Sequence, residues 1–227
     1  MLGWVRFPAR RLLDSTPFET VLEQPPMRLI WLIAATLLLS RAAFAQEPGS
    51  PPPAAPPGPK ILISTDMGDI EIQLDAAHAP VTVANFLRYA HEGHYDGTIF
   101  YRVVPGFVIQ AGSWEPNLQT RAVHPPIPLE AGLPNLRGTV AMARGDAPVS
   151  ATAEFFINLA DNSPLDRQAS DTAGTTGYAV FGQVIAGMDT VDRIAAVPVG
   201  DHGPFPGAAP VTPIVITHIL FLPDTAP

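Results

Sequence analysis

The chain has 227 residues, a length that suits one domain of ordinary size with short extensions. Hydrophobic residues make up 47% of it, enough to build a core, and cysteine is absent, which excludes structural disulfides and thiolate metal sites. Acidic residues outnumber basic ones by 21 to 13, and this net charge of −8 disfavours nucleic acid and anionic lipid as partners, because phosphate groups are bound by clustered cations.

Residues 27–45, MRLIWLIAATLLLSRAAFA, have the three parts of a secretory signal peptide. Arg28 supplies a positive start, 29–39 form an apolar run, and 43–45 give the small-x-small pattern that signal peptidase reads. This run is shorter than the roughly 20 residues that a helix needs to span a bilayer. We therefore expect cleavage before Gln46 and an exported product, with an uncleaved membrane anchor as the alternative.

Residues 1–26 precede this signal and hold three acidic residues, which is unusual for the start of a signal peptide. Met27 is an alternative translation start, so 1–26 are either a gene-start artefact or a long extension. Residues 1–45 hold five of the basic and three of the acidic residues, which leaves 8 basic and 18 acidic residues and a net charge of −10 after cleavage. Residues 46–59, QEPGSPPPAAPPGP, predict an extended, proline-rich linker.

The folded pattern begins at Lys60, and we expect residues 60–227 to form one domain. Apolar residues alternate on both sides of Met67-Gly68-Asp69, which predicts a β-hairpin over 60–74.

A helix is predicted in the segment that follows, 80–97. Apolar residues recur there at helical spacing, Thr82 is a candidate N-cap and Gly93 a candidate stop. Further strands are predicted at 98–104, 107–112, 138–143, 154–159, 178–185 and 213–222, a second helix at 188–197, and loops at 113–136 and 198–212. Two helices among about eight strands, without βαβ alternation, predict a mainly β fold, an antiparallel barrel or sandwich capped by helices.

One strand-like segment, FYRVVPGFVIQAG (100–112), carries Arg102 and Gln110 among apolar neighbours and a Pro105-Gly106 break. Burying a guanidinium is costly unless it is paired, and proline is rare in the middle of a sheet. The segment resembles the signature of the cyclophilins, the cyclosporin-binding class of peptidyl-prolyl cis-trans isomerases. Further segments similar to this family follow in family order: YDGTIF (95–100), LRGTVAMAR (136–144), SATAEFFINLADN (150–162), LD (165–166) and GYAVFGQVIAGMDTVDRI (177–194).

This resemblance covers roughly residues 60–222 and implies a closed eight-stranded antiparallel β-barrel capped by two α-helices. The signal peptide, the tyrosine of GYAVFG and the proline-rich C-terminal segment resemble the bacterial branch that works in the periplasm, so we expect a periplasmic protein. The implied activity is rotation of X–Pro bonds in unfolded or partly folded polypeptides, without a cofactor.

The resemblance assigns the catalytic role to Arg102. In the twisted transition state the proline nitrogen regains a lone pair that the planar amide lacks, and a hydrogen-bond donor aimed at it favours that state over the ground state. The family pattern places the remaining substrate contacts at Phe107, Val108, Gln110, Ala143, Arg144, Phe156, Leu165 and Tyr178. Phe156 takes the face opposite to Phe155 by strand alternation, which supports a pocket role for Phe156 and a core role for Phe155.

Four positions depart from the family pattern, among them Val149, which replaces an asparagine. Tyr101 stands where histidine is usual, and Glu154 replaces the glutamine of the usual QFF; we expect Glu154 to pair with Arg144 or Arg102. Pro164 replaces a tryptophan or phenylalanine. Because that tryptophan contributes to cyclosporin binding in the family, we expect weak cyclosporin binding.

Other chemistry finds little support in the sequence. His91 and His94 are three residues apart, but no third metal ligand lies near them, and GxSxG, GxGxxG and P-loop spacings are absent. We expect a monomer without metal or cofactor. Two functions remain: a foldase that isomerises X–Pro bonds in exported proteins, or a chaperone or scaffold that binds proline segments with little turnover. An intact Arg102 favours the enzyme.

Overall fold

The computed structural model describes residues 58–169 and 176–223. The predictions for 1–26, for the signal peptide at 27–45 and for most of the linker at 46–59 lie outside these residues. Within the described ranges, no helix has the length and apolar character that crossing a membrane requires.

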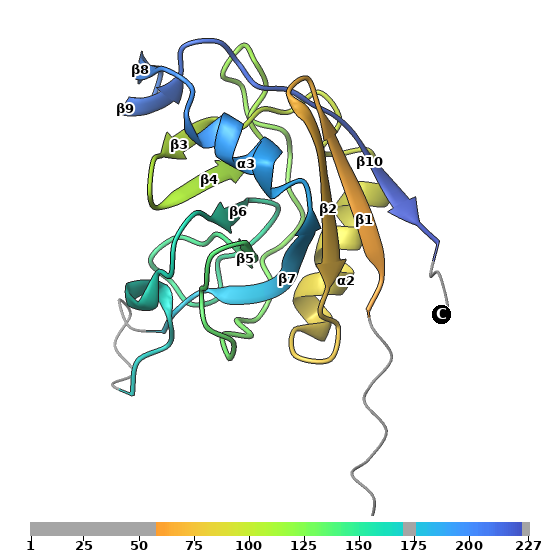
Figure 1. Cartoon of the computed structure of the whole chain (residues 1–227). Helices are drawn as coiled ribbons and strands as arrows, with labels where there is room; N and C mark the ends of the chain where they lie inside the picture. Colours follow the sequence, from red (N-terminus) through yellow and green to blue (C-terminus); the bar gives the residue numbers. More distant parts are fainter. Residues whose placement is uncertain (1–57, 170–175, 224–227) are drawn as a thin grey trace, which may run out of the picture. The chain divides into compact units, whose positions relative to one another are not determined.

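Eight strands form one antiparallel sheet that curls around a core (Figure 1). Their order across the sheet is β10-β1-β2-β7-β5-β6-β4-β3. The strands are β1 (Lys60–Thr65), β2 (Gly68–Leu74), β3 (Arg102–Val104), β4 (Val108–Ala111), β5 (Thr139–Met142), β6 (Phe155–Asn158), β7 (Ala179–Ala186) and β10 (Ile216–Leu222).

The first and last strands of the sheet in sequence, β1 and β10, pair with each other, and Lys60 lies opposite Leu222. Between β3 and β10 there is no continuous ladder; a single bridge joins Ile99 to Val215. The predicted eight-stranded antiparallel fold with two helices is confirmed. The sheet is a strongly curled half-barrel, however, and not a barrel closed by hydrogen bonds along its whole seam.

The first helix, α2 (Pro80–His91), is capped by a distant carboxylate, so the predicted N-cap at Thr82 was wrong. Glu130 accepts hydrogen bonds from the backbone N–H groups of Val81 (3.1 Å) and Thr82 (2.8 Å). Proline at the first helical position lacks an N–H and is pre-set for the helix, which explains where α2 starts. The predicted stop is confirmed, because Gly93 follows the helix with φ +67°. The second helix is α3 (Met188–Ala195).

Side chains of the sheet divide between two apolar clusters. The larger is the core between the sheet and the helices, and it contains the fully buried Phe155 and Phe86. The smaller cluster consists of Val108, Ala141, Phe156 and Val180. Adjacent residues of β6 thus point to opposite faces, as alternation along a strand requires. The predicted separation of Phe155 from Phe156 is confirmed.

A second, two-stranded sheet was missed by the sequence analysis. Strands β8 (Val199–His202) and β9 (Phe205–Pro210) pair within the segment predicted as a loop, 198–212. The hairpin packs beside β3 through Phe205, whose ring lies 4.6 Å from that of Tyr101 and 4.8 Å from that of Trp114. It therefore supports the residue that precedes Arg102.

Candidate active site

The predicted bend at Pro105-Gly106 is a tight turn that joins β3 to β4. The backbone N–H of Phe107 donates to the carbonyl of Val104 at 3.0 Å, and Gly106 has φ +73°, a conformation that side chains disfavour. The turn brings Arg102 directly opposite Gln110 in the antiparallel register. Both polar side chains therefore emerge on one face of the hairpin.

All nine residues predicted for the site line a single pocket of about 150 Å³. They are Arg102, Phe107, Val108, Gln110, Ala143, Arg144, Phe156, Leu165 and Tyr178. The structure brings together residues from five separate segments of the chain. Their individual roles in binding and catalysis stay predictions.

Arg102 lies at the polar side of this pocket. Its Nη1 donates to Oε1 of Gln110 at 3.0 Å, and its Cζ lies 6.0 Å from the centre of the Phe107 ring. Among the described residues, no carboxylate forms an ion pair with Arg102. Arginine is always protonated in proteins and carries five N–H donors. The neutral amide of Gln110 uses one of them and does not neutralise the charge, which stays at the pocket.

The apolar side of the pocket rests on the smaller cluster. Val108 and Phe156 are buried, and the Tyr178 ring packs edge-on against Phe156 with their centres 5.5 Å apart. Leu165 belongs to a short 3₁₀ helix (Ser163–Leu165), and its carbonyl accepts a hydrogen bond from the Tyr178 N–H at 3.0 Å. The result is a small apolar hollow with one cationic wall.

Arg144 is held in place by contacts with the neighbouring loop. Its guanidinium donates to the carbonyl of Gly177 (2.9 Å) and to the hydroxyl of Thr176 (2.8 Å), and its Cζ lies 4.8 Å from the Tyr178 ring centre. A second hollow of about 140 Å³ shares Gln110, Ala143 and Arg144 with the first. The two hollows therefore form one groove. Sequence reasoning missed Ser150 and Thr152, which line its second part.

The expected ion pair of Glu154 with Arg144 or Arg102 was wrong. Glu154 lines the second hollow together with Arg144 but forms no ion pair with either arginine, and it accepts a hydrogen bond from the Ser113 N–H at 2.8 Å. Burial raises the pKa of Glu154 to about 7, against the lowering effect of its contacts with Ser113 and Tyr101. Gly112 leaves room for the Glu154 side chain, because a Cβ at position 112 would lie 2.5 Å from Glu154 Oε2.

A larger hollow of about 530 Å³ lies elsewhere, between the turn at 75–78, the loop at 133–136 and β7. It contains none of the residues predicted for the site. Within the part of the chain that the structure describes, no three histidine or carboxylate side chains come together as potential metal ligands.

A curled eight-stranded antiparallel sheet with two helices, carrying an apolar pocket beside the Arg102 guanidinium, defines the cyclophilin class of peptide-binding proteins. The family model "Cyclophilin type peptidyl-prolyl cis-trans isomerase/CLD" matches residues 60–220. The chain belongs to this family, and it is a peptidyl-prolyl cis-trans isomerase. Enzymes of this family act on polypeptides that contain proline.

Bacterial relatives match over most of their length. Peptidyl-prolyl cis-trans isomerase A of Dickeya dadantii is 45% identical over 187 residues, which cover 82% of this chain and 93% of the relative. Peptidyl-prolyl cis-trans isomerase B of Escherichia coli K12 is 49% identical over 145 residues, 63% of this chain and 88% of the relative. The crystal structure of a cyclophilin-type isomerase from Cryptosporidium parvum shares the fold, with a TM-score of 0.62 at 24% identity, covering 73% of this chain and 98% of that one.

Proposed function

We propose that this enzyme is a periplasmic foldase, which accelerates rotation of X–Pro bonds in exported polypeptides with Arg102 as the catalytic residue. The observation that carries the proposal is the position of the Arg102 guanidinium, fixed by Gln110 at the edge of an apolar pocket. The proline ring of a substrate would occupy the apolar part. A donor of Arg102 would then face the proline nitrogen.

The chemistry requires little more than this arrangement. Rotation about an X–Pro bond takes tens to hundreds of seconds because amide resonance must be broken. As the bond twists, the nitrogen becomes pyramidal and gains a lone pair, so a donor there binds the transition state more strongly than either planar isomer. Arginine suits the task because its planar fork keeps several donors in fixed directions.

Magnitudes indicate that Arg102 works together with the pocket. Shortening tens of seconds to milliseconds requires about 10⁴-fold, or roughly 5.4 kcal/mol. One preorganised donor in a site shielded from water contributes about 2.7–4 kcal/mol. The remaining contribution would come from Phe107, Phe156 and Leu165, which would hold the ring still while the preceding carbonyl rotates.

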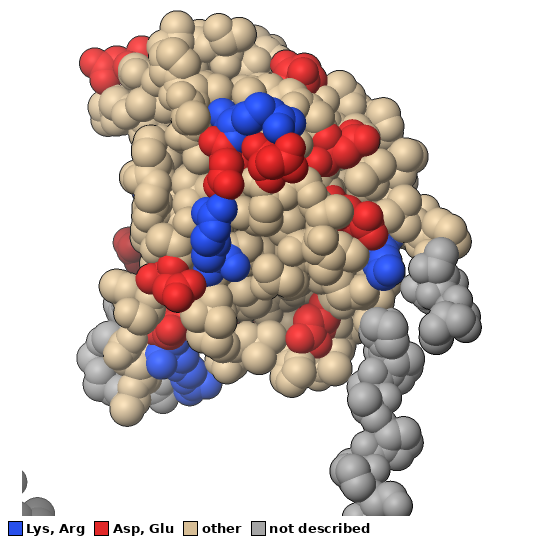
Figure 2. Space-filling view, in the orientation of Figure 1, with Lys and Arg blue, Asp and Glu red and all other residues tan. Residues whose placement is uncertain are grey.

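The proposed location rests on the sequence. Residues 27–45 have the pattern of a signal peptide, and the expected mature chain has a net charge of −10. On the face drawn in Figure 2, basic side chains lie beside acidic ones. Arg137 and Asp192, for example, form an ion pair at 2.8 Å. This distribution supports polypeptides and not nucleic acids as partners. Mass spectrometry of the mature N-terminus from a periplasmic extract tests the location, and a mass that includes 27–45 would contradict cleavage.

The activity test uses residues 46–227 and an Ala-Pro peptide, with isomer exchange followed by NMR. We expect Arg102→Ala to lower kcat/KM by about 10²–10³-fold. Arg88→Ala is the matched control, because Arg88 is exposed on α2 and contacts Asn85 instead of the pocket. Equal activity of the Arg102 and Arg88 variants would overturn the proposed role of Arg102.

The alternative is a chaperone or scaffold that uses the same groove to hold proline segments with little turnover. The neighbourhood of Glu154, where the chain departs from the family pattern, is the feature that favours it. Peptide binding by both wild type and Arg102→Ala, with no acceleration of exchange by either, would establish this alternative.

A further inference from the structure

A chain of hydrogen bonds leads away from Arg102 into the protein. Arg102 Nη1 donates to Oε1 of Gln110, and Nε2 of Gln110 donates to the hydroxyl of Tyr101. The direction of both bonds is fixed by chemistry. A guanidinium has only donors, so the amide must present its oxygen to Arg102 and its NH₂ group to Tyr101.

The Tyr101 hydroxyl needs an acceptor for its own proton. Its oxygen already accepts from Gln110, and a buried hydroxyl without an acceptor is costly. The Glu154 carboxylate lies near it and raises the pKa of Tyr101 beyond the larger increase caused by burial. One oxygen of Glu154 is committed to the Ser113 N–H. The other, Oε2, is buried and is the one buried side-chain polar atom without a partner among the described residues.

We propose that Glu154 is a positioning residue for the isomerase reaction, whose Oε2 accepts the Tyr101 hydroxyl, fixes the Gln110 amide and thereby holds Arg102 at the pocket. The inference rests on the proposed function, since it assumes that Arg102 is catalytic. Glu154 forms no ion pair with Arg102, so its effect on Arg102 would pass through Tyr101 and Gln110.

Packing fixes Tyr101 independently of these hydrogen bonds. Its side chain is 5% exposed, and its ring forms a three-ring cluster with those of Trp114 (centres 5.8 Å apart) and Phe205 (4.6 Å), which also contact each other. The hydroxyl can therefore not turn toward solvent to find another acceptor. Removal of the Tyr101 oxygen alone, as in Tyr101→Phe, should leave the ring in place.

The charge of Glu154 should matter because an ionised carboxylate is a stronger acceptor than a neutral carboxyl. With its pKa raised to about 7 by burial, Glu154 changes charge near neutral pH. As the pH falls below this value, the chain of hydrogen bonds weakens and Arg102 is held less firmly. We expect kcat/KM to fall about fivefold between pH 8.5 and pH 5.5, with its midpoint near 7.

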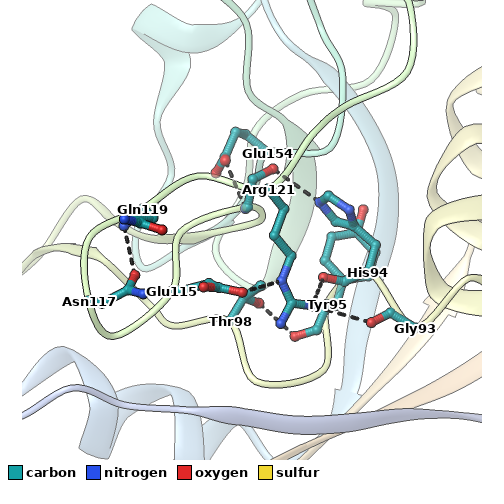
Figure 3. Close-up of polar contacts among 10 residues, drawn as sticks. Gly93, His94, Tyr95, Thr98, Glu115, Asn117, Gln119, Arg121 and Glu154 are labelled. Carbon is teal, nitrogen blue, oxygen red and sulfur yellow. Dashed lines mark hydrogen bonds and ion pairs between the residues drawn. The ribbon is translucent and has the colours of Figure 1, made fainter.

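Other titratable and charged groups lie near Glu154, and their contribution to the pH profile must be distinguished from that of Glu154. Tyr95 lies close but its hydroxyl donates to the Ala153 carbonyl. His94 contacts the Ser113 hydroxyl at 3.1 Å, and its pKa is lowered by burial and by Arg121, which donates to the His94 carbonyl (Figure 3).

Arg102 and Arg144 are the cations nearest along the groove, and both keep their charge throughout the range. His94 is thus the competing explanation for a pH effect.

The test measures kcat/KM by NMR exchange from pH 5.5 to 8.5 for wild type, Tyr101→Phe, Glu154→Gln and His94→Gln. We expect Tyr101→Phe to lower activity about fivefold at pH 8 and to abolish the pH dependence. Glu154→Gln keeps an acceptor but cannot ionise, so its profile should be flat. His94→Gln should keep the wild-type profile. In wild type, the Gln110 side-chain amide resonance should titrate with the same midpoint as the activity.

Several outcomes would overturn the inference: a flat wild-type profile, an unchanged profile in Tyr101→Phe, or loss of the profile in His94→Gln. Thermal unfolding of each variant shows whether it is folded. If Glu154→Gln does not fold, the pH profile of Tyr101→Phe alone tests the inference. If Arg102→Ala is inactive while Tyr101→Phe and Glu154→Gln behave as wild type, the inference fails and the proposed function stands. If Arg102→Ala is fully active, the proposed function itself fails.

Discussion

Neighbouring phenylalanines on β6 should have separate effects on stability and on activity. Phe155 is fully buried in the main core, and its ring lies edge-on to those of Phe86, Tyr95 and Phe100, with centres 5.5 Å, 5.6 Å and 6.4 Å away. Phe156 lines the candidate substrate pocket, and its ring contacts that of Tyr178. Substitution of each by leucine removes one ring while keeping an apolar side chain of similar size.

The expected magnitudes follow from these contacts. Each aromatic pair contributes about 0.5–1.5 kcal/mol beyond its buried area, so the loss of three pairs in Phe155→Leu should lower the free energy of unfolding by about 1.5–4.5 kcal/mol. Phe156→Leu loses a single pair and should cost about 1 kcal/mol. A small change in an apolar pocket alters binding by about 1–3 kcal/mol, so Phe156→Leu should lower kcat/KM by about 10–200-fold.

Both variants should be compared by urea unfolding and by NMR exchange on the same Ala-Pro peptide at 10 °C. Phe155→Leu should retain kcat/KM within about twofold, since the residue does not line the pocket. A folded Phe155→Leu protein that loses as much activity as Phe156→Leu would refute the separation of the two faces.

Three further predictions concern other parts of the molecule. Glu130→Ala should lower the free energy of unfolding by about 1–2 kcal/mol in urea, because it removes the acceptor at the start of α2; an unchanged midpoint would contradict this. The pKa of Glu154 is raised from 4.5 to about 7, so the folded state binds this proton more tightly than the unfolded state does. The stability gained from the protonated carboxyl is therefore complete below pH 4.5 and is lost as the pH rises through 7. The free energy of unfolding of Glu154→Gln should therefore rise relative to that of wild type by up to about 3 kcal/mol between pH 4.5 and pH 8. A difference between the two proteins that stays constant over this range would contradict the raised pKa. Cyclosporin should bind weakly, because the exposed Pro164 stands where the family has an aromatic residue; a nanomolar Kd in a fluorescence titration would refute this.

Much of the fold could be predicted because it depends on local pattern. Alternation over 60–74 placed the first hairpin, and the strand ends lie within a few residues of those predicted. The β8–β9 hairpin was missed because its strands are short, contain glycine and proline, and show no alternation of buried and exposed residues. Such strands lack the apolar alternation by which a half-buried strand is recognised.

The candidate site residues were predicted from the resemblance to a family. The contacts that the sequence could not predict join residues far apart in the chain. Glu130 lies 48 residues from the N–H of Thr82 that it caps, so no local signal could identify it. Glu154 was expected near an arginine because opposite charges attract. The structure instead gives it the Ser113 N–H and the neighbourhood of Tyr101, which only the folded sheet brings together.

The pairing of β1 with β10 has a consequence for how the chain reaches its native state. Lys60 lies opposite Leu222, so the first and last strands of the sheet in sequence pair with each other along one ladder. Contacts between such distant residues form late and slow the folding of β proteins, because chain entropy is lost before the contact is gained. During synthesis or export, β1 cannot obtain its second neighbour until the last strand has emerged. An enzyme that relieves slow proline steps in other chains is itself subject to a delayed final step.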